Sequence, residues 1–208
     1  MAGSFNTGGN FPTPTCVETF KPVNDDKRLI EQTLAGDSAA FGRLVRKYQD
    51  RLYNTMVHVV GRGDDAMDVV QDAFVQAFVK LDSFKQTAAF YTWLYRIAFN
   101  VASTYRRKRK PTLSVDRVRE VSGEEPVEPG IGPADKMERD ERCRQVRAAI
   151  AGLTEEHRTV IVLREIDGCC YETIAEILDL PVGTVRSRLH RARLQLKELL
   201  REVLMLDD

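Results

Sequence analysis

The residues of this chain with the most evident chemistry are a run of cations near its carboxyl end. Residues 181–197 hold four arginines and a histidine but no acid. Guanidinium groups donate hydrogen bonds to phosphate oxygens and to guanine edges, so the run predicts contact with DNA. An amphipathic core helix with a solvated basic face is the alternative, although such a face usually mixes charges. The predicted contact residues are Thr184, Arg186, Ser187, Arg188, His190 and Arg191.

The element that must position these cations is the second helix of a pair. Residues 171–200 predict two short helices with a break at 179–181, and Pro181 suits the start of the second. Its apolar positions recur at steps of four and three, which places one stripe away from the cations. The pattern indicates a helix-turn-helix, whose second helix enters the major groove of duplex DNA. The stripe comprises Val185, Leu189, Ala192, Leu196, Leu199 and Val203.

A second group able to contact nucleic acid lies at residues 83–110. Seven aromatic residues, including the single tryptophan, precede the basic run 106–110. Rings that stack on bases, next to cations for phosphates, favour single-stranded DNA. Some of these residues belong to the core, since Phe90, Leu94, Ile97 and Val101 share one helical face, and the basic run alone could be a solvated helix end. A second row, Tyr91, Tyr95 and Phe99, is the better candidate for contact.

Residues 64–81 predict a helix with an acidic ridge opposite an apolar stripe. Asp64, Asp65, Asp68 and Asp72 lie off the stripe, and like charges four apart cost a few tenths of a kcal/mol each. The first two also favour a helix start, but Asp72 lies two turns inside, which favours a basic protein partner. The stripe, expected to be core, comprises Val69, Val70, Ala73, Phe74, Ala77, Phe78 and Leu81.

Composition excludes several classes of protein. The 31 basic and 31 acidic residues balance, so DNA contact must come from local clusters. No apolar run approaches the ~18 residues of a membrane span, and the start lacks a signal pattern, so a cytoplasmic location is expected. The four cysteines lack zinc-site spacing. No nucleophile–base pair, phosphate loop or metal cluster is apparent, so we predict no catalytic residue, no metal and no cofactor.

Helical periodicity recurs along the chain and predicts an all-α fold of two small helical domains joined by a flexible acidic linker. Residues 1–23 are rich in Gly, Thr and Pro and predict a flexible tail. The first domain covers 24–110. Residues 111–136, with acids, prolines and glycines, predict a mobile linker. The second domain covers 137–208, with caps expected at Thr154 and Cys170.

The order of these segments resembles the sigma factors of bacterial RNA polymerase, in particular the extracytoplasmic function (ECF) group of the sigma-70 family and its sigma-E type. The matching segments are DDAMDVVQDAFVQAF, LDSF, AFYTWLYRIAFN, the basic run, the acidic linker and DLPVGTVRSRLHRAR. The resemblance covers about residues 25–204. It implies a non-enzymatic initiation factor that binds core polymerase, reads the −35 element as duplex and captures the −10 element as a separated strand.

The resemblance also implies roles for individual residues. The 24–110 domain becomes sigma region 2 and the 137–208 domain sigma region 4. Asn100 matches the position that lines a pocket for a flipped base, and an anti-sigma factor is a plausible further partner. The helix-turn-helix residues named above match the −35 reader. The segment that docks on polymerase is Asp68, Val69, Val70, Gln71, Asp72, Ala73 and Phe74, and the −10 residues are Tyr91, Trp93, Tyr95, Phe99, Asn100, Tyr105, Arg106 and Arg107.

Two positions depart from the family pattern. Cys170 stands where Ser or Thr is usual at a helix cap, and His190 occupies a variable base-reading position, so the −35 sequence cannot be copied from a relative. A stand-alone helix-turn-helix regulator, binding duplex DNA without polymerase, is the rival interpretation, but it leaves the aromatic row unexplained. An enzyme acting on DNA lacks any catalytic constellation.

Overall fold

The computed structural model describes residues 24–109 and 133–204, and within these ranges every regular element is helical. The expected tail and most of the expected linker lie outside the described residues. The first half contains α1 (Asn24–Leu34), α2 (Ser38–Val60), α3 (Gly63–Val79), a 3-10 turn (Leu81–Ser83) and α4 (Phe90–Arg109). The second half contains α5 (Pro133–Gly152), α6 (Glu155–Ile161), a π-helical turn (Val162–Ile166), α7 (Tyr171–Leu178) and α8 (Val182–Leu204).

Local sequence signals account for most helix boundaries. Asp37 caps α2 by accepting a hydrogen bond from the Ala39 N–H at 3.0 Å, and Gly61 ends that helix in the left-handed conformation with φ 89°. Thr154 caps α6, as predicted, through the His157 N–H. Asp179 ends α7 at φ 55°, a conformation that an aspartate tolerates better than most residues.

Three boundaries or faces differ from the expectation. The helix expected near residue 137 begins at Pro133, because proline fits the first helical position, so the predicted linker overlaps its first turn. Beyond Ile161 the regular α-helical geometry gives way to the π-helical turn. Phe78, expected in the core, is 48% exposed and packs only its edge on Phe41 at 5.0 Å.

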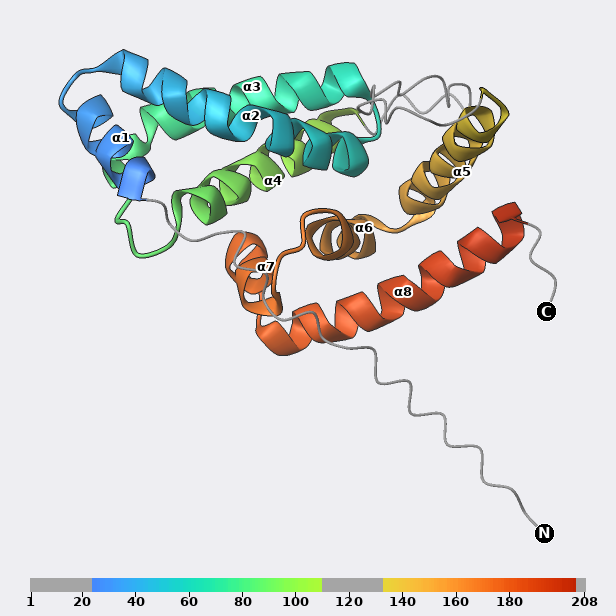
Figure 1. The fold of residues 1–208 in the computed structure, drawn as a ribbon. Coiled ribbons are helices and arrows are strands. Elements are labelled where there is room, and N and C mark those ends of the chain that lie inside the picture. Colours follow the sequence, from blue (N-terminus) through green and yellow to red (C-terminus); the bar gives the residue numbers. More distant parts are fainter. Residues whose placement is uncertain (1–23, 110–132, 205–208) are drawn as a thin grey trace, which may run out of the picture.

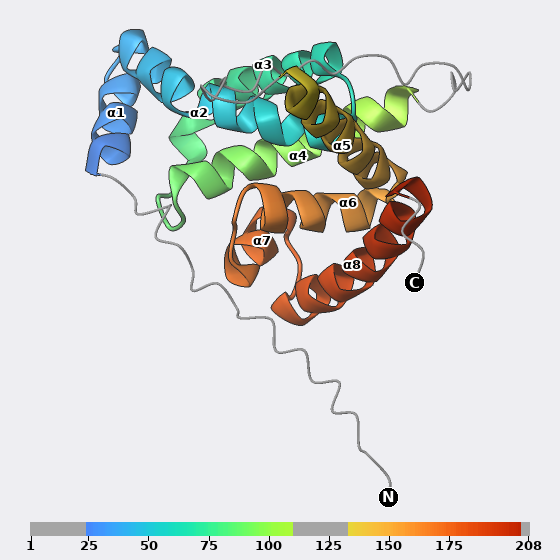
Figure 2. The ribbon, with the colours of Figure 1, turned by 45° about the vertical axis from the view of Figure 1, so that its right-hand side comes forward.

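The two halves pack against each other around one continuous core. Helices α2, α3 and α4 contact one another, while α4 also contacts α7, and α2 contacts the π-helical turn. Figure 1 shows α2, α3 and α4 above α6, α7 and α8, and the turned view in Figure 2 keeps α4 next to α6 and α7. The two expected domains therefore contact each other directly, a contact that the prediction of two domains on a flexible linker did not include.

Candidate nucleic-acid and protein interfaces

The arginine-rich face of α8 is open to solvent over its first turns. Val185, Leu189 and Ala192 are buried and fix the helix against the second half. The cations project from the other side. Thr184 is half-buried, and its carbonyl accepts a hydrogen bond from Ser187 Oγ at 3.0 Å. The exposed members of the predicted set are Arg186, Ser187, His190 and Arg191.

Arg188 differs from its neighbours because it is partly buried and paired with an acid of α6 in the same half. Its Nη2 forms an ion pair with Glu156 Oε2 at 3.0 Å, and its side chain is 25% exposed. Arg193, one turn and a half further along α8, pairs with Glu165 at 2.7 Å. These carboxylates from α6 and the π-helical turn set the direction of two arginines on the helix.

The predicted −10 residues of α4 divide into an accessible group and a buried group. Asn100 and Arg107 are exposed, and Trp93 is half-buried against Phe84 at a ring distance of 5.0 Å. The Tyr105 hydroxyl donates to Asp65 Oδ1 at 2.9 Å, which ties the end of α4 to α3. Arg106 Nη1 lies 3.8 Å from Glu155 Oε2, across the two halves.

The buried group is the row that the sequence favoured for DNA contact. Tyr91 is 2% exposed, Tyr95 is fully buried and Phe99 is 8% exposed. They are covered by the second half, so in this arrangement they are core and not a free surface. The expectation of an open contact row is therefore wrong for the packed chain. Contact with DNA through these rings requires the halves to separate.

A buried polar network joins the two halves at this row. Asp167 accepts hydrogen bonds from Thr55 Oγ1 at 2.8 Å and from the Tyr95 hydroxyl at 3.4 Å. Arg51 donates to the Asp167 carbonyl at 2.6 Å and to its carboxylate at 3.4 Å. Burial raises the pKa of Asp167 above its usual value, while the bonds from Thr55 and Arg51 oppose that rise.

Cys169 continues the same contact. Its Sγ and the Tyr91 hydroxyl share a hydrogen bond at 2.8 Å, and the thiol side chain is 1% exposed. Burial raises the pKa of the Cys169 thiol to about 12, so the group stays protonated and unreactive in this position. Arg158 also bridges the two halves, because it is buried and donates to the carbonyl oxygens of Val59 in the first half and Leu153 in the second.

Sequence reasoning missed the residues of this network. Thr55 lies on the apolar face of α2, between Leu52 and Val59. A polar residue at a position whose helical spacing predicts burial was the one sign in the sequence that Thr55 has a buried partner. Asp167 and Cys169 carried none, because their partners lie about seventy or more positions away along the chain.

A groove runs beside this contact between α4 and the helix-turn-helix. Its volume is about 760 Å³, and its walls hold side chains of both charge signs. Asn100 of the −10 set and Arg188 of the −35 set both line it. The structure thus brings together two residues that were predicted to read separate DNA elements.

Helix α3 exposes three acids of the predicted ridge, Asp64, Asp68 and Asp72, whereas the fourth, Asp65, is 6% exposed and accepts the hydrogen bond from Tyr105. Asp68, Gln71 and Asp72 are exposed, whereas Val69, Val70, Ala73 and Phe74 are buried and hold the helix on the first half. Four large apolar side chains of the same helix are also exposed, and one of them, Phe78, was expected in the core. They are Met67 at 47%, Val75 at 62%, Phe78 at 48% and Val79 at 71% exposure.

The described residues contain neither a metal-binding cluster nor a membrane-spanning helix. No group of three or more His, Cys, Asp or Glu side chains there is arranged to hold a metal ion. Among the described helices, none is long and apolar enough to cross a membrane.

Comparison with known proteins gives two family matches, one in each half. Sigma-70 region 2 matches residues 44–112, and Sigma-70, region 4 matches residues 143–196. The ECF RNA polymerase sigma-E factor of Escherichia coli (strain K12) is 43% identical over 173 residues, which cover 81% of this chain and 90% of that protein.

Two solved structures are similar in fold. CnrH in complex with the cytosolic domain of CnrY gives a TM-score of 0.64 at 31% identity, with 86% of this chain and 99% of that chain covered. The sigma factor RpoE in complex with the anti-sigma factor NepR, from Bartonella quintana, gives 0.59 at 26% identity, with 81% and 98% covered.

Proposed function

The chain belongs to the ECF sigma factors of the sigma-70 family. From this premise we propose which of its surfaces binds the −35 element, the −10 element and core polymerase. As a member of that family it is a non-enzymatic initiation factor, which binds core RNA polymerase and directs it to promoters. The observation that supports the assignment is the order of the two family matches: residues 44–112, which include α3 and α4, precede residues 143–196, which include α7 and the start of α8. The cytoplasm, where core polymerase works, is its proposed location.

The start of α8 reads the −35 element as duplex. Its exposed residues Arg186, Ser187, His190 and Arg191 face away from the core, and a helix of this kind fits the major groove. Thr184 and the first turn supply donors to phosphate oxygens. Arg188 joins them once its ion pair with Glu156 is released.

Helix α4 captures the −10 element as a separated strand. Asn100 carries both a donor and an acceptor, which suits the edge of a flipped base. Trp93, Tyr105, Arg106 and Arg107 supply rings and charges along the same helix. Tyr91, Tyr95 and Phe99 extend this surface only when the second half moves away.

The exposed side of α3 binds core polymerase. Asp68 and Asp72 offer negative charge to a basic partner, and Gln71 lies between them. The neighbouring Met67 and Val75 are exposed apolar groups, which mark a protein-binding surface. The combination favours a partner with both apolar and basic contacts.

The two reading surfaces cannot serve a promoter while they are packed together. Elements 25 base pairs apart lie roughly 85 Å apart at about 3.4 Å per base pair. Helix α8, the longest element of the second half, has 23 residues and spans only about 35 Å at 1.5 Å per residue. The halves must therefore separate on the promoter, and the 23 residues 110–132 reach at most roughly 80 Å when extended.

An anti-sigma factor is a further proposed partner. The solved complex with NepR pairs a similar sigma factor with such an inhibitor. A protein that holds the halves together, or that covers α3, would block polymerase binding by this chain.

In vitro transcription with core polymerase tests the proposed function. Core enzyme alone, core enzyme with this chain, and the chain with duplex DNA alone are compared on a library of promoter fragments. Promoter-specific transcripts are expected only when core enzyme and chain are both present. Transcripts that do not depend on the chain would overturn the assignment, and tight duplex binding without polymerase would favour the stand-alone regulator.

A further inference from the structure

The first turn of α1 carries a buried carboxylate whose partners lie on another helix. Asp26 is 7% exposed, and it accepts hydrogen bonds from Lys47 and from the Tyr48 hydroxyl, the latter at 2.5 Å. Apolar packing already holds α1 in place, since Leu29 and Ile30 are each 2% exposed. A buried carboxylate costs free energy unless it is paired, so the two donors offset the cost of this position. The bonds also fix the direction of two side chains of α2.

The network holds Tyr48 both by its hydroxyl and by its ring. Burial and the neighbouring Asp26 carboxylate raise the pKa of the Tyr48 hydroxyl, so the group stays protonated and donates. The Lys47 Nζ atom lies 5.3 Å from the centre of the same ring, at cation–π distance. The orientation of the ring is therefore set by its polar partners as well as by its apolar neighbours.

The Tyr48 ring is the first member of a ring cluster that leads to Trp93, one of the predicted −10 residues. Its centroid lies 5.6 Å from that of Phe90, the first residue of α4, and the Phe90 ring lies 5.8 Å from Trp93. Phe84 completes the cluster, at 5.0 Å from Trp93 and 5.9 Å from Phe90. Rings in contact favour edge or offset geometries, so turning one ring displaces the next. The direction of the Tyr48 hydroxyl thus reaches Trp93 through one intervening ring.

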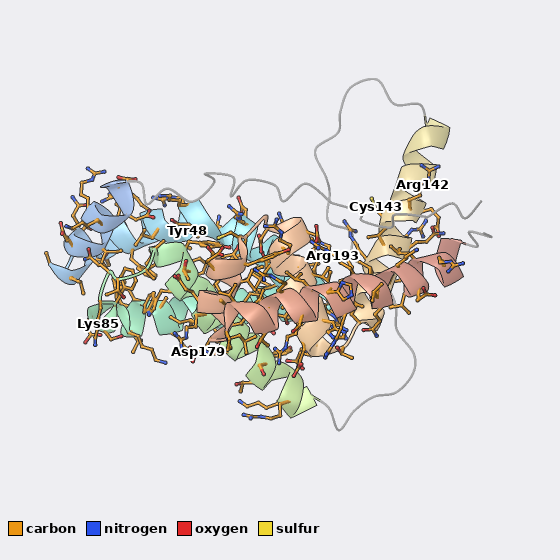
Figure 3. All side chains as sticks on the ribbon, turned by 90° about the horizontal axis from the view of Figure 1, so that it is seen from below. Tyr48, Lys85, Arg142, Cys143, Asp179 and Arg193 are labelled. Carbon is orange, nitrogen blue, oxygen red and sulfur yellow. The ribbon has the colours of Figure 1, made fainter. Side chains whose placement is uncertain are left out.

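Asp26 and Tyr48 lie apart from the surfaces assigned above. Helix α1 precedes residues 44–112, which match Sigma-70 region 2, so Asp26 is outside that match. Tyr48 lies toward the same end of the molecule as Lys85, in the segment that leads into α4 (Figure 3). Asp26 is buried and the Tyr48 hydroxyl points to it, so neither offers a free polar group to DNA. Any effect of this pair on the −10 strand must pass through the ring cluster.

We propose that Asp26 and Tyr48 are positioning residues for capture of the −10 strand, because the bond between them holds the ring cluster with Trp93 ready to stack on an unpaired base. The inference rests on the proposed function of α4. A ring already held in its binding orientation loses little conformational freedom when it binds, and this raises affinity. Loss of the bond leaves the rings in contact but free to turn, while Leu29 and Ile30 still hold α1.

Two conservative variants break the bond, and a third is the matched control. Tyr48→Phe keeps the ring and removes the hydroxyl. Asp26→Asn removes the charge with little change of shape. Asp25→Asn makes the same charge change one residue earlier, where the side chain is 43% exposed and pairs with Arg28 of the same helix at 2.6 Å.

Trp93 is the single tryptophan of the chain, so its fluorescence reports on the ring cluster directly. Acrylamide quenching is measured on the full chain of each variant, together with circular dichroism. Tyr48→Phe and Asp26→Asn should each raise the quenching rate constant at least about twofold, because the cluster opens more often. Asp25→Asn should match the parent, and all variants should keep the parent's helix content.

Binding by the assembled holoenzyme, core polymerase with each variant, measures the effect on strand capture. The probes are a forked promoter fragment, with duplex −35 and a single-stranded −10 strand, and the same fragment cut back to its −35 duplex. Tyr48→Phe and Asp26→Asn should weaken binding to the forked fragment about tenfold, as expected for one hydrogen bond to a charged group. Binding to the −35 duplex should stay unchanged. In a Trp93→Leu background, Tyr48→Phe should have no further effect, since the ring that it positions is absent.

Two results would overturn the positioning role. One is a Tyr48→Phe variant that matches the parent in both quenching and forked binding. The other is an effect of Tyr48→Phe that is as large with Trp93→Leu as without it, which would mark the bond as an anchor of α1 alone. Trp93→Leu by itself tests the proposed function. If it leaves forked binding unchanged, the −10 role of this ring fails and the positioning role fails with it. A loss in Trp93→Leu without a loss in Tyr48→Phe removes the positioning role alone.

Discussion

At the scale of single residues, Asn100 is the predicted base-reading group that is already accessible. Its side chain is exposed and lines the groove between the halves, next to the buried Phe99. The buried neighbour fixes the backbone of α4, so the amide has a defined position. If this one amide reads a base of the −10 element, its removal should impair −10 recognition selectively.

Asn100→Ala should reduce discrimination among −10 sequences by about tenfold while −35 recognition is unchanged, because one pair of hydrogen bonds to a base edge is lost. Transcription from promoters with single −10 or −35 changes measures both effects. Ser103→Ala, one turn along the same groove, is the control and should behave as the parent. Equal use of all −10 variants by the parent would rule out this role.

Cys170 is a second residue whose chemistry predicts a measurable effect. It occupies the N-cap of α7, and its side chain makes no capping hydrogen bond; its Sγ instead lies 3.1 Å from Thr173 Oγ1. Cys170→Ser should raise the stability of the second half by up to about 1 kcal/mol, since a hydroxyl caps better than a thiol. Thermal melting measures the change, with Cys143→Ser as control. An unchanged or lower melting temperature would contradict the capping argument.

At the scale of elements, α3 has two faces with separate tasks. Ala66, Val69 and Ala73 are fully buried and hold the helix on α2 and α4. The other face mixes exposed acids with exposed apolar side chains. A change on that face should therefore affect binding and leave the fold intact.

Asp68→Lys combined with Asp72→Lys should weaken binding to core polymerase at least about a hundredfold, because like charges then face each other across the interface. Circular dichroism should show unchanged helix content. Asp50→Lys with Asp82→Lys makes the same charge change at exposed sites outside the ridge and is the control. Retained polymerase binding in the ridge variant would show that the acids are merely solvated.

At the scale of the whole molecule, the buried carboxylate of Asp167 makes the packing of the halves depend on pH. Burial raises its pKa, so the packed form binds a proton more readily than the unfolded chain does. The stability that this adds is complete below the ordinary value of 3.8 and is lost as pH rises through the raised pKa. Neutral pH therefore leaves the halves less firmly joined than acid does.

The difference in unfolding free energy between the parent and Asp167→Ala should accordingly be largest at acid pH and decline as pH rises. Urea unfolding of both proteins from about pH 4 to 8 measures it, and the subtraction removes the groups that the two proteins share. A difference that grows with pH would show that attraction to Arg51 outweighs the burial of the carboxylate.

The local sequence pattern was sufficient to predict the helices and the side chains that face solvent. The cap at Thr154, the N-cap position of Cys170, the break before Pro181 and the stripe of Val185, Leu189 and Ala192 all depend on neighbours a few positions away. The exposed acids of α3 and the exposed cations of α8 follow from the same periodicity. These features were therefore predictable from the sequence, and so was the all-α fold.

Only the tertiary structure shows that the aromatic row of α4, Tyr91, Tyr95 and Phe99, is buried. Tyr91 and Tyr95 have the same sequence neighbours whether they face DNA or Asp167, and aromatic rings with a hydroxyl suit both surroundings. The sequence by itself determined which helices form, which family they belong to and which side of each helix is apolar. Only the tertiary structure decided what covers α4, because that contact joins residues far apart in the chain and no local pattern encodes its geometry.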